Sequence, residues 1–316
     1  MRDKAKTVRI TTAQAGSRLD KFLADFDVSR SRAAWQRLIK EEKILINGKM
    51  AKANYILKEN DGLEVLPEDV TAEKAPALIP DIDIIYEDAD VIVIDKPIGV
   101  VAQKAATSDA PAVTAFLEKH FPAIRQVGEN EQRSGIVHRL DKDTSGIMIA
   151  AKNQESFELL KNKFKQREVQ KFYTALVYGK VEPAAGEINF AIGRNPKLPC
   201  QQTVIRDPEN SSIKSREART LYKTLKTYED YSLLSVELKT GRMHQIRVHM
   251  KAIGHPVAGD AKYAGASLLR KTPELRRQFL HASELKITLP SGENRVFKSE
   301  LPADLSHFLK NLDSLD

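Results

Sequence analysis

The segment from residue 67 to residue 80, PEDVTAEKAPALIP, constrains the fold more than any other part of the sequence. It contains three prolines, no aromatic residue and little periodicity, so we expect a linker rather than a helix or a strand. A chain of 316 residues is also longer than one ordinary domain. The sequence therefore predicts a small domain over residues 1–67, a linker over 68–80 and a larger domain over 81–316.

Charge is unevenly distributed along these segments. Residues 1–40 contain ten basic and four acidic residues, whereas residues 41–100 contain six basic and fourteen acidic residues. The remainder is basic, and the whole chain has a net charge of +7. This pattern favours two basic modules that share one polyanionic ligand, although a charge run is also typical of an ordinary solvated surface.

Composition and targeting signals exclude several classes of protein. A single cysteine, Cys200, excludes a disulfide framework and a cysteine zinc cluster. The N-terminal string MRDKAKTVRITT lacks the apolar core of a signal peptide, and no apolar run approaches the roughly 18 residues of a membrane span. We therefore expect a globular cytoplasmic protein, with a monomer as the default.

The N-terminal segment is patterned as two amphipathic helices followed by a hairpin. The first helix would be capped by Ser17 and would bury Leu19, Phe22, Leu23 and Phe26. The second would begin at Ser29 or Ser31 and bury Trp35, Leu38 and Ile39, leaving a basic opposite face. Asn47-Gly48 then predicts a tight turn after a short strand.

The string SRLDKFLADFDVSRSRAAWQRLIKEEKILINGK resembles the alpha-L RNA-binding fold, over about residues 8–67. Here Glu41-Glu42 replaces the glycine that this family usually has before the strand. The resemblance implies RNA contacts by Arg30, Arg32, Gln36 and Lys40. Cations on one helix face can contact the phosphates of a folded RNA without reading its sequence. A basic solvent-facing surface on a small packing domain is the alternative interpretation.

The densest cluster of reactive side chains is the string GIVHRLDKDTSGIMIAAK, residues 135–152. Apolar strands at 136–137 and 147–149 would hold a charged loop between them, and loops on a rigid sheet are common places for chemistry. Asp141 lies between Arg139 and Lys142, whose charges favour a carboxylate at neutral pH. A polar hairpin tip, with Thr144 and Ser145 bonded to the backbone, accounts for the same string.

Together with IIYEDADVIVIDKP before it and TGRMHQIRVHMKAIGHPVAGDAKY after it, this string resembles the RluA family of RNA pseudouridine synthases. The match covers most of residues 82–304. It implies an α+β protein, in which a catalytic domain has a mixed, mainly antiparallel sheet with a central cleft, and a small α/β N-terminal domain binds RNA. It also implies that Asp141 is the essential catalytic residue, that Tyr173 packs on the target base and that Arg247 pairs with the carboxylate.

Further residues near these three are expected to contact RNA, namely Arg139, Arg242 and His244. Met243, Ile246, Met250 and Ile253 have helical spacing and predict an apolar stripe, so that Arg247 can reach Asp141 from the other face. Relatives usually have threonine at the position of Met243. The helix that contains Lys161, Lys163, Lys165 and Arg167 would expose these cations to RNA or simply to solvent.

The chemistry requires no cofactor, because isomerisation of uridine involves no net water, redox change or group donor. A metal site is not expected, since His244, His249 and His255 do not share one helical face and have no carboxylate or cysteine partners nearby. Large-subunit ribosomal RNA is the expected substrate class, because family members with this N-terminal module commonly act on it. Transfer RNA is one alternative, and a non-catalytic RNA-binding protein in ribosome assembly is another.

Overall fold

The computed structural model describes residues 6–27, 30, 32–66, 79–103, 110–129, 133–198 and 200–314. These residues form two compact units, the first within residues 6–66 and the second within residues 79–314. The expected caps Ser29 and Ser31, and residues 68–78 of the expected linker, lie outside the described residues.

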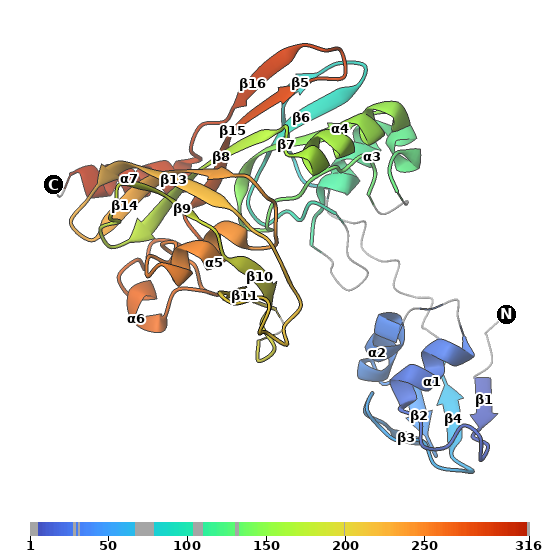
Figure 1. The fold of residues 1–316 in the computed structure, drawn as a ribbon. Coiled ribbons are helices and arrows are strands. Elements are labelled where there is room, and N and C mark those ends of the chain that lie inside the picture. Colours follow the sequence, from blue (N-terminus) through green and yellow to red (C-terminus); the bar gives the residue numbers. More distant parts are fainter. Residues whose placement is uncertain are drawn as a thin grey trace. The chain divides into compact units, whose positions relative to one another are not determined.

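The first unit combines two helices with a small antiparallel sheet of strand order β1-β4-β2-β3 (Figure 1). Its elements are β1 (Lys6–Arg9), α1 (Leu19–Phe26), α2 (Arg32–Lys40), β2 (Ile44–Ile46), β3 (Lys49–Met50) and β4 (Gly62–Val65). Trp35, Leu38 and Ile39 are buried in its core, as the helical pattern predicts. The predicted turn is confirmed, since Asn47 and Gly48 adopt positive φ angles of 53° and 74° between β2 and β3.

Two details of the first helix differ from the sequence prediction. The cap position of α1 is occupied by Arg18 instead of Ser17, and no side chain caps the helix. Arg18 instead pairs with the buried Asp20, at 3.1 Å between Nε and Oδ1. Phe26 is 51% exposed rather than buried, because it is the last residue of α1 and is beyond the core.

The second unit contains the remaining elements. Before the expected charged loop lie β5 (Asp83–Glu87), β6 (Val91–Lys96), α3 (Val113–His120) and a 3-10 helix (Pro122–Gln126). After it come β7 (Ser145–Ala151), α4 (Gln154–Gln166), β8 (Gln170–Tyr178), β9 (Ala185–Ile188), β10 (Ala191–Arg194), β11 (Gln202–Ile205) and β12 (Ser215–Arg216). The C-terminal part comprises β13 (Thr220–Thr227), β14 (Tyr231–Leu238), α5 (Gln245–Ala252), α6 (Ala266–Leu269), β15 (Leu280–Thr288), β16 (Asn294–Lys298) and α7 (Ala303–Asp313).

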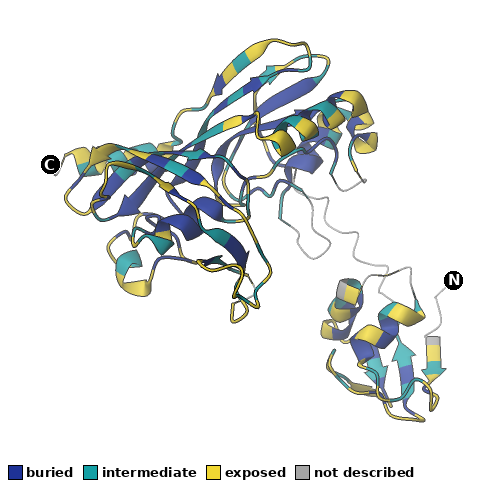
Figure 2. Ribbon diagram, in the orientation of Figure 1, coloured by how far each residue is buried: buried dark blue, intermediate teal, exposed yellow. Residues whose placement is uncertain are grey.

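Within the described residues, one nine-stranded sheet forms the centre of this unit, in the order β5-β6-β7-β15-β8-β14-β13-β9, with β16 paired to β15. Every neighbouring pair is antiparallel except β7 and β15, so the predicted α+β fold with a mixed, mainly antiparallel sheet is confirmed. A smaller sheet, β11-β10-β12, lies near α5 (Figure 1). The central strands are buried and the helices expose their outer sides (Figure 2).

The loop that contains Asp141 is held by the one parallel junction of the sheet. Gly146, the second residue of β7, pairs with Ala282 of β15 and has a φ angle of 115°. A Cβ atom at this position would lie 2.3 Å from the Ala282 carbonyl oxygen, so only glycine fits. The expected strand at 136–137 is not formed: Ile136 makes a single bridge to Ala150, because the chain turns away into the loop.

No helix among the described residues has both the length and the apolar character needed to cross a bilayer.

Candidate active site

A cavity of about 560 Å³ opens beside the loop of residues 138–144. Its walls come from this loop, from α4, from β8 and from the segment between β14 and α5. Asp141 lies on the wall with its side chain 23% exposed, so it can be reached from the cavity. The predicted central cleft is therefore present next to the cluster of reactive residues.

Arg247 connects Asp141 to a second, fully buried carboxylate. Its Nη1 donates to Asp141 Oδ2 at 2.9 Å, which is the contact expected from the sequence. Its Nε and Nη2 donate to the two oxygens of Asp260, at 2.6 and 2.7 Å. Because Asp260 has no exposed surface and holds the guanidinium by two bonds, the direction of the third bond is fixed. The carboxylate of Asp141 is thereby oriented by a rigid donor.

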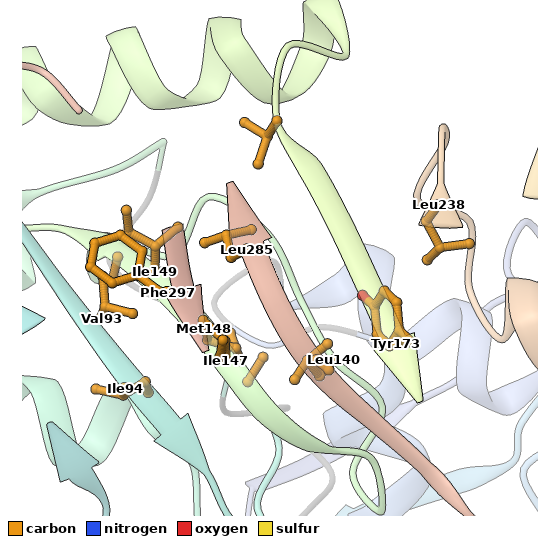
Figure 3. Packing of buried hydrophobic residues seen from close by; sticks show 14 of the residues in the cluster. Val93, Ile94, Leu140, Ile147, Met148, Ile149, Tyr173, Leu238, Leu285 and Phe297 are labelled. Carbon is orange, nitrogen blue, oxygen red and sulfur yellow. The ribbon is translucent and has the colours of Figure 1, made fainter. Parts of the chain in front are cut away.

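Tyr173 lies on β8 and lines the same cavity. It is 7% exposed and ends an apolar cluster, with Leu140 and Leu238 nearby (Figure 3). Burial, and secondarily the charge of Asp141, raise the pKa of the Tyr173 phenol well above its usual value. The residue is therefore a neutral aromatic ring at the wall and not a base.

His138 packs inside the loop. Its ring stacks on Phe164 at 4.6 Å between centroids, and its Nε2 accepts a hydrogen bond from the Ile149 backbone N–H at 3.0 Å. Part of the residue remains exposed, but burial of the ring and, secondarily, the charge of the nearby Lys171 lower the pKa of His138 to about 3. A neutral ring with this nitrogen occupied orients the loop and does not serve as a general base.

The three expected RNA contacts of this unit all line the cavity. Arg139 is exposed beside Asp141. Arg242 is partly buried, and its Nε donates to the Glu217 carbonyl at 2.9 Å. His244 places Nε2 3.9 Å from Asp141 Oδ2. Met243 lies before α5 and is 38% exposed at the cavity, so its predicted place in an apolar helical stripe is wrong. Ile246 and Met250 are buried as expected.

The wall of the cavity is strongly basic. Among its described residues, Asp141 is the one carboxylate. Against it stand Arg139, Lys161, Lys165, Arg167, Lys171, Lys239, Arg242 and Arg247. Lys161, Lys165 and Arg167 lie on α4 or at its C-terminal end. The other end of this helix is capped by the Asn153 side chain, which accepts a hydrogen bond from the Ser156 N–H. Such a surface suits a polyanion that must approach a single negative group.

Residues outside the cavity hold the loop in place. Lys96 is fully buried, and its Nζ donates to the carbonyl oxygens of Pro97 and Val100 at 2.9 Å and of Lys142 at 3.1 Å. Burial lowers the pKa of Lys96 to about 7, against the opposite effect of Asp143 and Asp141. Gln278 donates to the Thr144 hydroxyl at 3.2 Å from the other side. The part of the loop that follows Asp141 is thus anchored at Lys142 and Thr144.

In the first unit, the expected RNA-binding residues divide into two groups. Arg32 and Gln36 donate to the buried Asp20, with shortest distances of 2.9 and 2.6 Å to Oδ2. Arg32 keeps half of its side chain exposed, so it can both pair internally and face a ligand. Arg30 lies over the Trp35 ring at 5.4 Å, and Lys40 is exposed.

Sequence reasoning did not assign roles to Asp260, Tyr263 or Lys96. Asp260 and Tyr263 belong to the string GHPVAGDAKY, which supported the family resemblance. The signal for Lys96 is its place at the end of the otherwise apolar strand VIVIDK. Tyr263 lies under the Arg247 guanidinium at 5.1 Å and bonds to His244. No group of three or more potential metal ligands occurs among the described residues. His249 and His255 bond to separate backbone carbonyls instead, those of Phe190 and Tyr178.

The fold and this basic cavity suit an enzyme that acts on a polyanion, and the first unit is a separate module with its own core. The family described as RNA pseudouridylate synthase matches residues 90–252, and the S4 domain matches residues 17–63. The chain belongs to the RNA pseudouridylate synthase family, and it is an isomerase that converts uridine to pseudouridine in RNA.

Individual relatives extend over nearly the whole chain. An uncharacterized RNA pseudouridine synthase of Bacillus subtilis is 38% identical over 300 residues, covering 95% of each chain. The ribosomal large subunit pseudouridine synthase D of Nitrosomonas europaea is 34% identical, over 99% of this chain and 90% of that protein. The solved structure of human RNA pseudouridylate synthase domain containing 1 is 26% identical with a TM-score of 0.56, and covers 74% of this chain and 95% of that one.

Proposed function

We propose that the chain isomerises specific uridines in large-subunit ribosomal RNA, with Asp141 as the essential carboxylate. The observation that carries this proposal is the 2.9 Å hydrogen bond from Arg247 to Asp141 at the wall of the cavity. Among the described residues of that wall, Asp141 is the one carboxylate beside eight Lys and Arg residues. The ribosomal substrate is supported by the likeness to the ribosomal large subunit synthase of Nitrosomonas europaea.

The reaction moves one bond and one proton. The N1–C1′ bond of uridine breaks, the uracil turns within the site, and a C5–C1′ bond forms. A proton leaves C5 and one is added to N1, so the product is an isomer of the substrate. A sugar that loses its base develops positive character. The Asp141 carboxylate can stabilise that charge, form a covalent adduct with the sugar or remove a proton from the ribose.

The neighbouring residues have matching roles. Tyr173 stays neutral and offers a ring on which the uracil stacks after it leaves the RNA helix. Arg247 orients the carboxylate, and Arg139 fills the gap left by the base or holds its phosphate. Arg242 and the cations of α4 contact the RNA backbone beside the cavity. In the first unit, Arg30, Arg32, Gln36 and Lys40 dock the RNA. The enzyme acts as a monomer and needs no cofactor, because no redox equivalent or group donor enters the balance.

The test gives purified protein separate samples of unmodified large-subunit ribosomal RNA and transfer RNA. Pseudouridines are mapped by carbodiimide modification and primer extension. We expect new stops in the ribosomal RNA with the wild type and none with Asp141→Asn. Modification of transfer RNA alone would contradict the substrate class, and RNA binding without modification by either protein would favour a non-catalytic role.

A further inference from the structure

The two ring nitrogens of His244 face different groups. Nε2 lies 3.9 Å from Asp141 Oδ2, beyond a direct hydrogen bond, whereas Nδ1 lies 2.8 Å from the Tyr263 hydroxyl. Tyr263 is buried, with 3% of its surface exposed, and it is held by its own backbone N–H, which donates to Asp260. Its ring meets His244 edge-on, at 5.6 Å between centroids. Which nitrogen of His244 carries the proton therefore depends on Tyr263.

The hydrogen bonds of the Tyr263 hydroxyl determine which ring nitrogen of His244 is protonated. The backbone N–H of Gln202, at the start of β11, donates to the hydroxyl oxygen at 2.8 Å. Among the described residues, His244 Nδ1 is the remaining partner of that hydroxyl and the acceptor available for its proton. If Nδ1 carried a proton instead, the buried hydroxyl would have no acceptor, which costs free energy. The satisfied arrangement runs from Gln202 N–H to the Tyr263 oxygen, and from the Tyr263 O–H to Nδ1.

We propose that Tyr263 is a positioning residue that holds His244 in the Nε2–H tautomer, so that His244 donates a hydrogen bond to a carbonyl oxygen of the reacting uracil. The inference deepens the proposed function of the Asp141 site and rests on it for the identity of the acceptor. The tautomer itself follows from the hydrogen bonds of His244 and Tyr263 alone.

Local charge and burial support a neutral, donating ring. The pKa of His244 is lowered, mainly by burial. The charges of Asp141 and Asp260 act in the opposite direction, whereas those of Arg247 and Lys262 add to the effect of burial. Burial raises the pKa of Tyr263 to about 12, so its hydroxyl keeps the proton that it donates. His244 also adopts a left-handed backbone with φ of 56°, an unfavourable conformation for a non-glycine residue that commonly marks functional sites.

The reaction gives this donor a use. When the N1–C1′ bond breaks, the uracil retains the bonding electron pair, and the negative charge spreads onto its carbonyl oxygens. A fixed N–H aimed at such an oxygen stabilises the charged state more than the ground state. A ring with an unprotonated Nε2 would instead present a lone pair to that oxygen and oppose the step.

The first measurement reads the tautomer without any activity. The full chain is labelled with ¹⁵N-histidine, and two-bond ¹H–¹⁵N correlations are recorded at pH 7.5, with His244→Gln used to assign the signal. We expect the Nε2–H pattern for His244 in the wild type, and its loss in Tyr263→Phe, which retains the ring beside Arg247. An Nδ1–H pattern for His244 in the wild type would overturn the inference, whether or not Tyr263→Phe folds.

The second measurement is single-turnover isomerisation, with the enzyme in excess over the RNA and at a saturating concentration. Tyr263→Phe is expected to slow the rate constant about tenfold, the equivalent of one lost hydrogen bond, with an unchanged Kd for RNA. Tyr231→Phe removes another buried tyrosine hydroxyl, one bonded to the Lys271 carbonyl, and should leave the rate unchanged. In His244→Gln the amide nitrogen is as many bonds from Cα as Nε2 is, so a donor is retained.

Adding Tyr263→Phe to His244→Gln should then have no effect on the rate. An equal tenfold loss in both backgrounds would show that Tyr263 acts structurally and would overturn the inference. If the wild type itself forms no pseudouridine while the Nε2–H pattern is present, the proposed function fails and the donor has another acceptor in RNA.

Discussion

Arg247 is the residue on which the candidate site depends most. Two of its nitrogens bond to Asp260, and a third bonds to Asp141, so a buried carboxylate is used to aim a cation at an accessible one. A guanidinium can do this because its donors lie in one plane at fixed angles, which a lysine ammonium cannot reproduce. The geometry of Asp141 is therefore determined partly by Asp260, which is fully buried and is not one of the residues that line the cavity.

Asp260→Asn should weaken both stability and rate. We expect the free energy of unfolding to fall by about 3 kcal/mol, because a buried ion pair loses one partner, and the isomerisation rate to fall at least tenfold. Urea unfolding and single-turnover kinetics measure the two effects. Glu187→Gln is the matched control, since Glu187 bonds to Arg219 in the same two-pronged way but on the surface. Equal losses in both variants would contradict this role of Asp260.

His138 predicts a defined pH dependence of stability. Its pKa is about 3 in the folded chain and near 6.5 when unfolded, so between these values the unfolded state binds the extra proton. The contribution of His138 to the free energy of unfolding is therefore fully present above pH 6.5. Below that value it is lost by about 1.4 kcal/mol for each unit by which the pH falls. The measurement is the unfolding free energy of the wild type minus that of His138→Gln from pH 7.5 to 4.5. A difference that does not change with pH would contradict the assignment.

At the scale of elements, the close approach of β7 and β15 fixes the loop that carries Asp141. Gly146 allows this approach, and Arg277 reinforces it by donating to the Ser145 hydroxyl at 3.3 Å and to Asp304 of α7 at 2.6 Å. His281 adds a bond between its Nδ1 and the same serine hydroxyl, at 3.0 Å. The start of β7 is therefore bonded to β15 and, through Arg277, to the C-terminal helix.

Gly146→Ala should separate β7 from β15. We expect a loss of about 3 kcal/mol or more in unfolding free energy, because the new methyl group overlaps the Ala282 carbonyl and the φ angle of 115° disfavours alanine. Gly292→Ala introduces the same methyl at a φ angle of 86° with open space around it, and should cost about 1 kcal/mol. Thermal unfolding of the two variants makes the comparison, and similar losses would show that overlap with β15 is unimportant.

Local patterns predicted several elements because those elements are determined by neighbouring residues. The Asn47-Gly48 turn and the second helix of the first unit, with its buried Trp35, Leu38 and Ile39, both have signals within a few positions. Residues 136–137 and Met243 were mispredicted because short apolar strings have the same appearance whether they pair, pack or face a cavity.

The candidate site was less accessible to sequence reasoning. The contact between Asp141 and Arg247 joins positions 106 residues apart, and a family resemblance, not spacing, indicated it. The bonds of Asp260 and Tyr263 depend on how the segment after α5 folds back on that helix, and no residue pattern records that path.

At the scale of the whole molecule, the proposed function assigns RNA docking to the first unit and isomerisation to the second. The first unit has its own core, and its basic helix is stabilised from inside by the Asp20 cluster. Arg18 and other donors lower the pKa of Asp20 well below its usual value, against the effect of burial. A basic surface that is already paired and ordered loses less entropy when it binds phosphates.

Removal of residues 1–78 should weaken RNA binding without abolishing the chemistry. We expect a lower affinity for large-subunit ribosomal RNA. In a plot of log K against the logarithm of the salt concentration, the slope should become less steep by about one unit for each lost phosphate contact. Fluorescence anisotropy over a salt series measures this. A short single-stranded RNA that contains the target uridine is the control, and its modification should persist. An unchanged slope would exclude a docking role for the first unit.

The most direct test of the central claim follows the hydrogen that isomerisation must release from C5. RNA labelled with tritium at uracil C5 is incubated with excess enzyme, and tritium released to water is counted over time. We predict that the wild type releases all of the label carried by the target uridines and that Asp141→Asn releases none above background. Asp143→Asn, which changes the exposed carboxylate two residues away, should release nearly as much as the wild type. Equal release by the wild type and Asp141→Asn would contradict the role of Asp141 as the essential carboxylate.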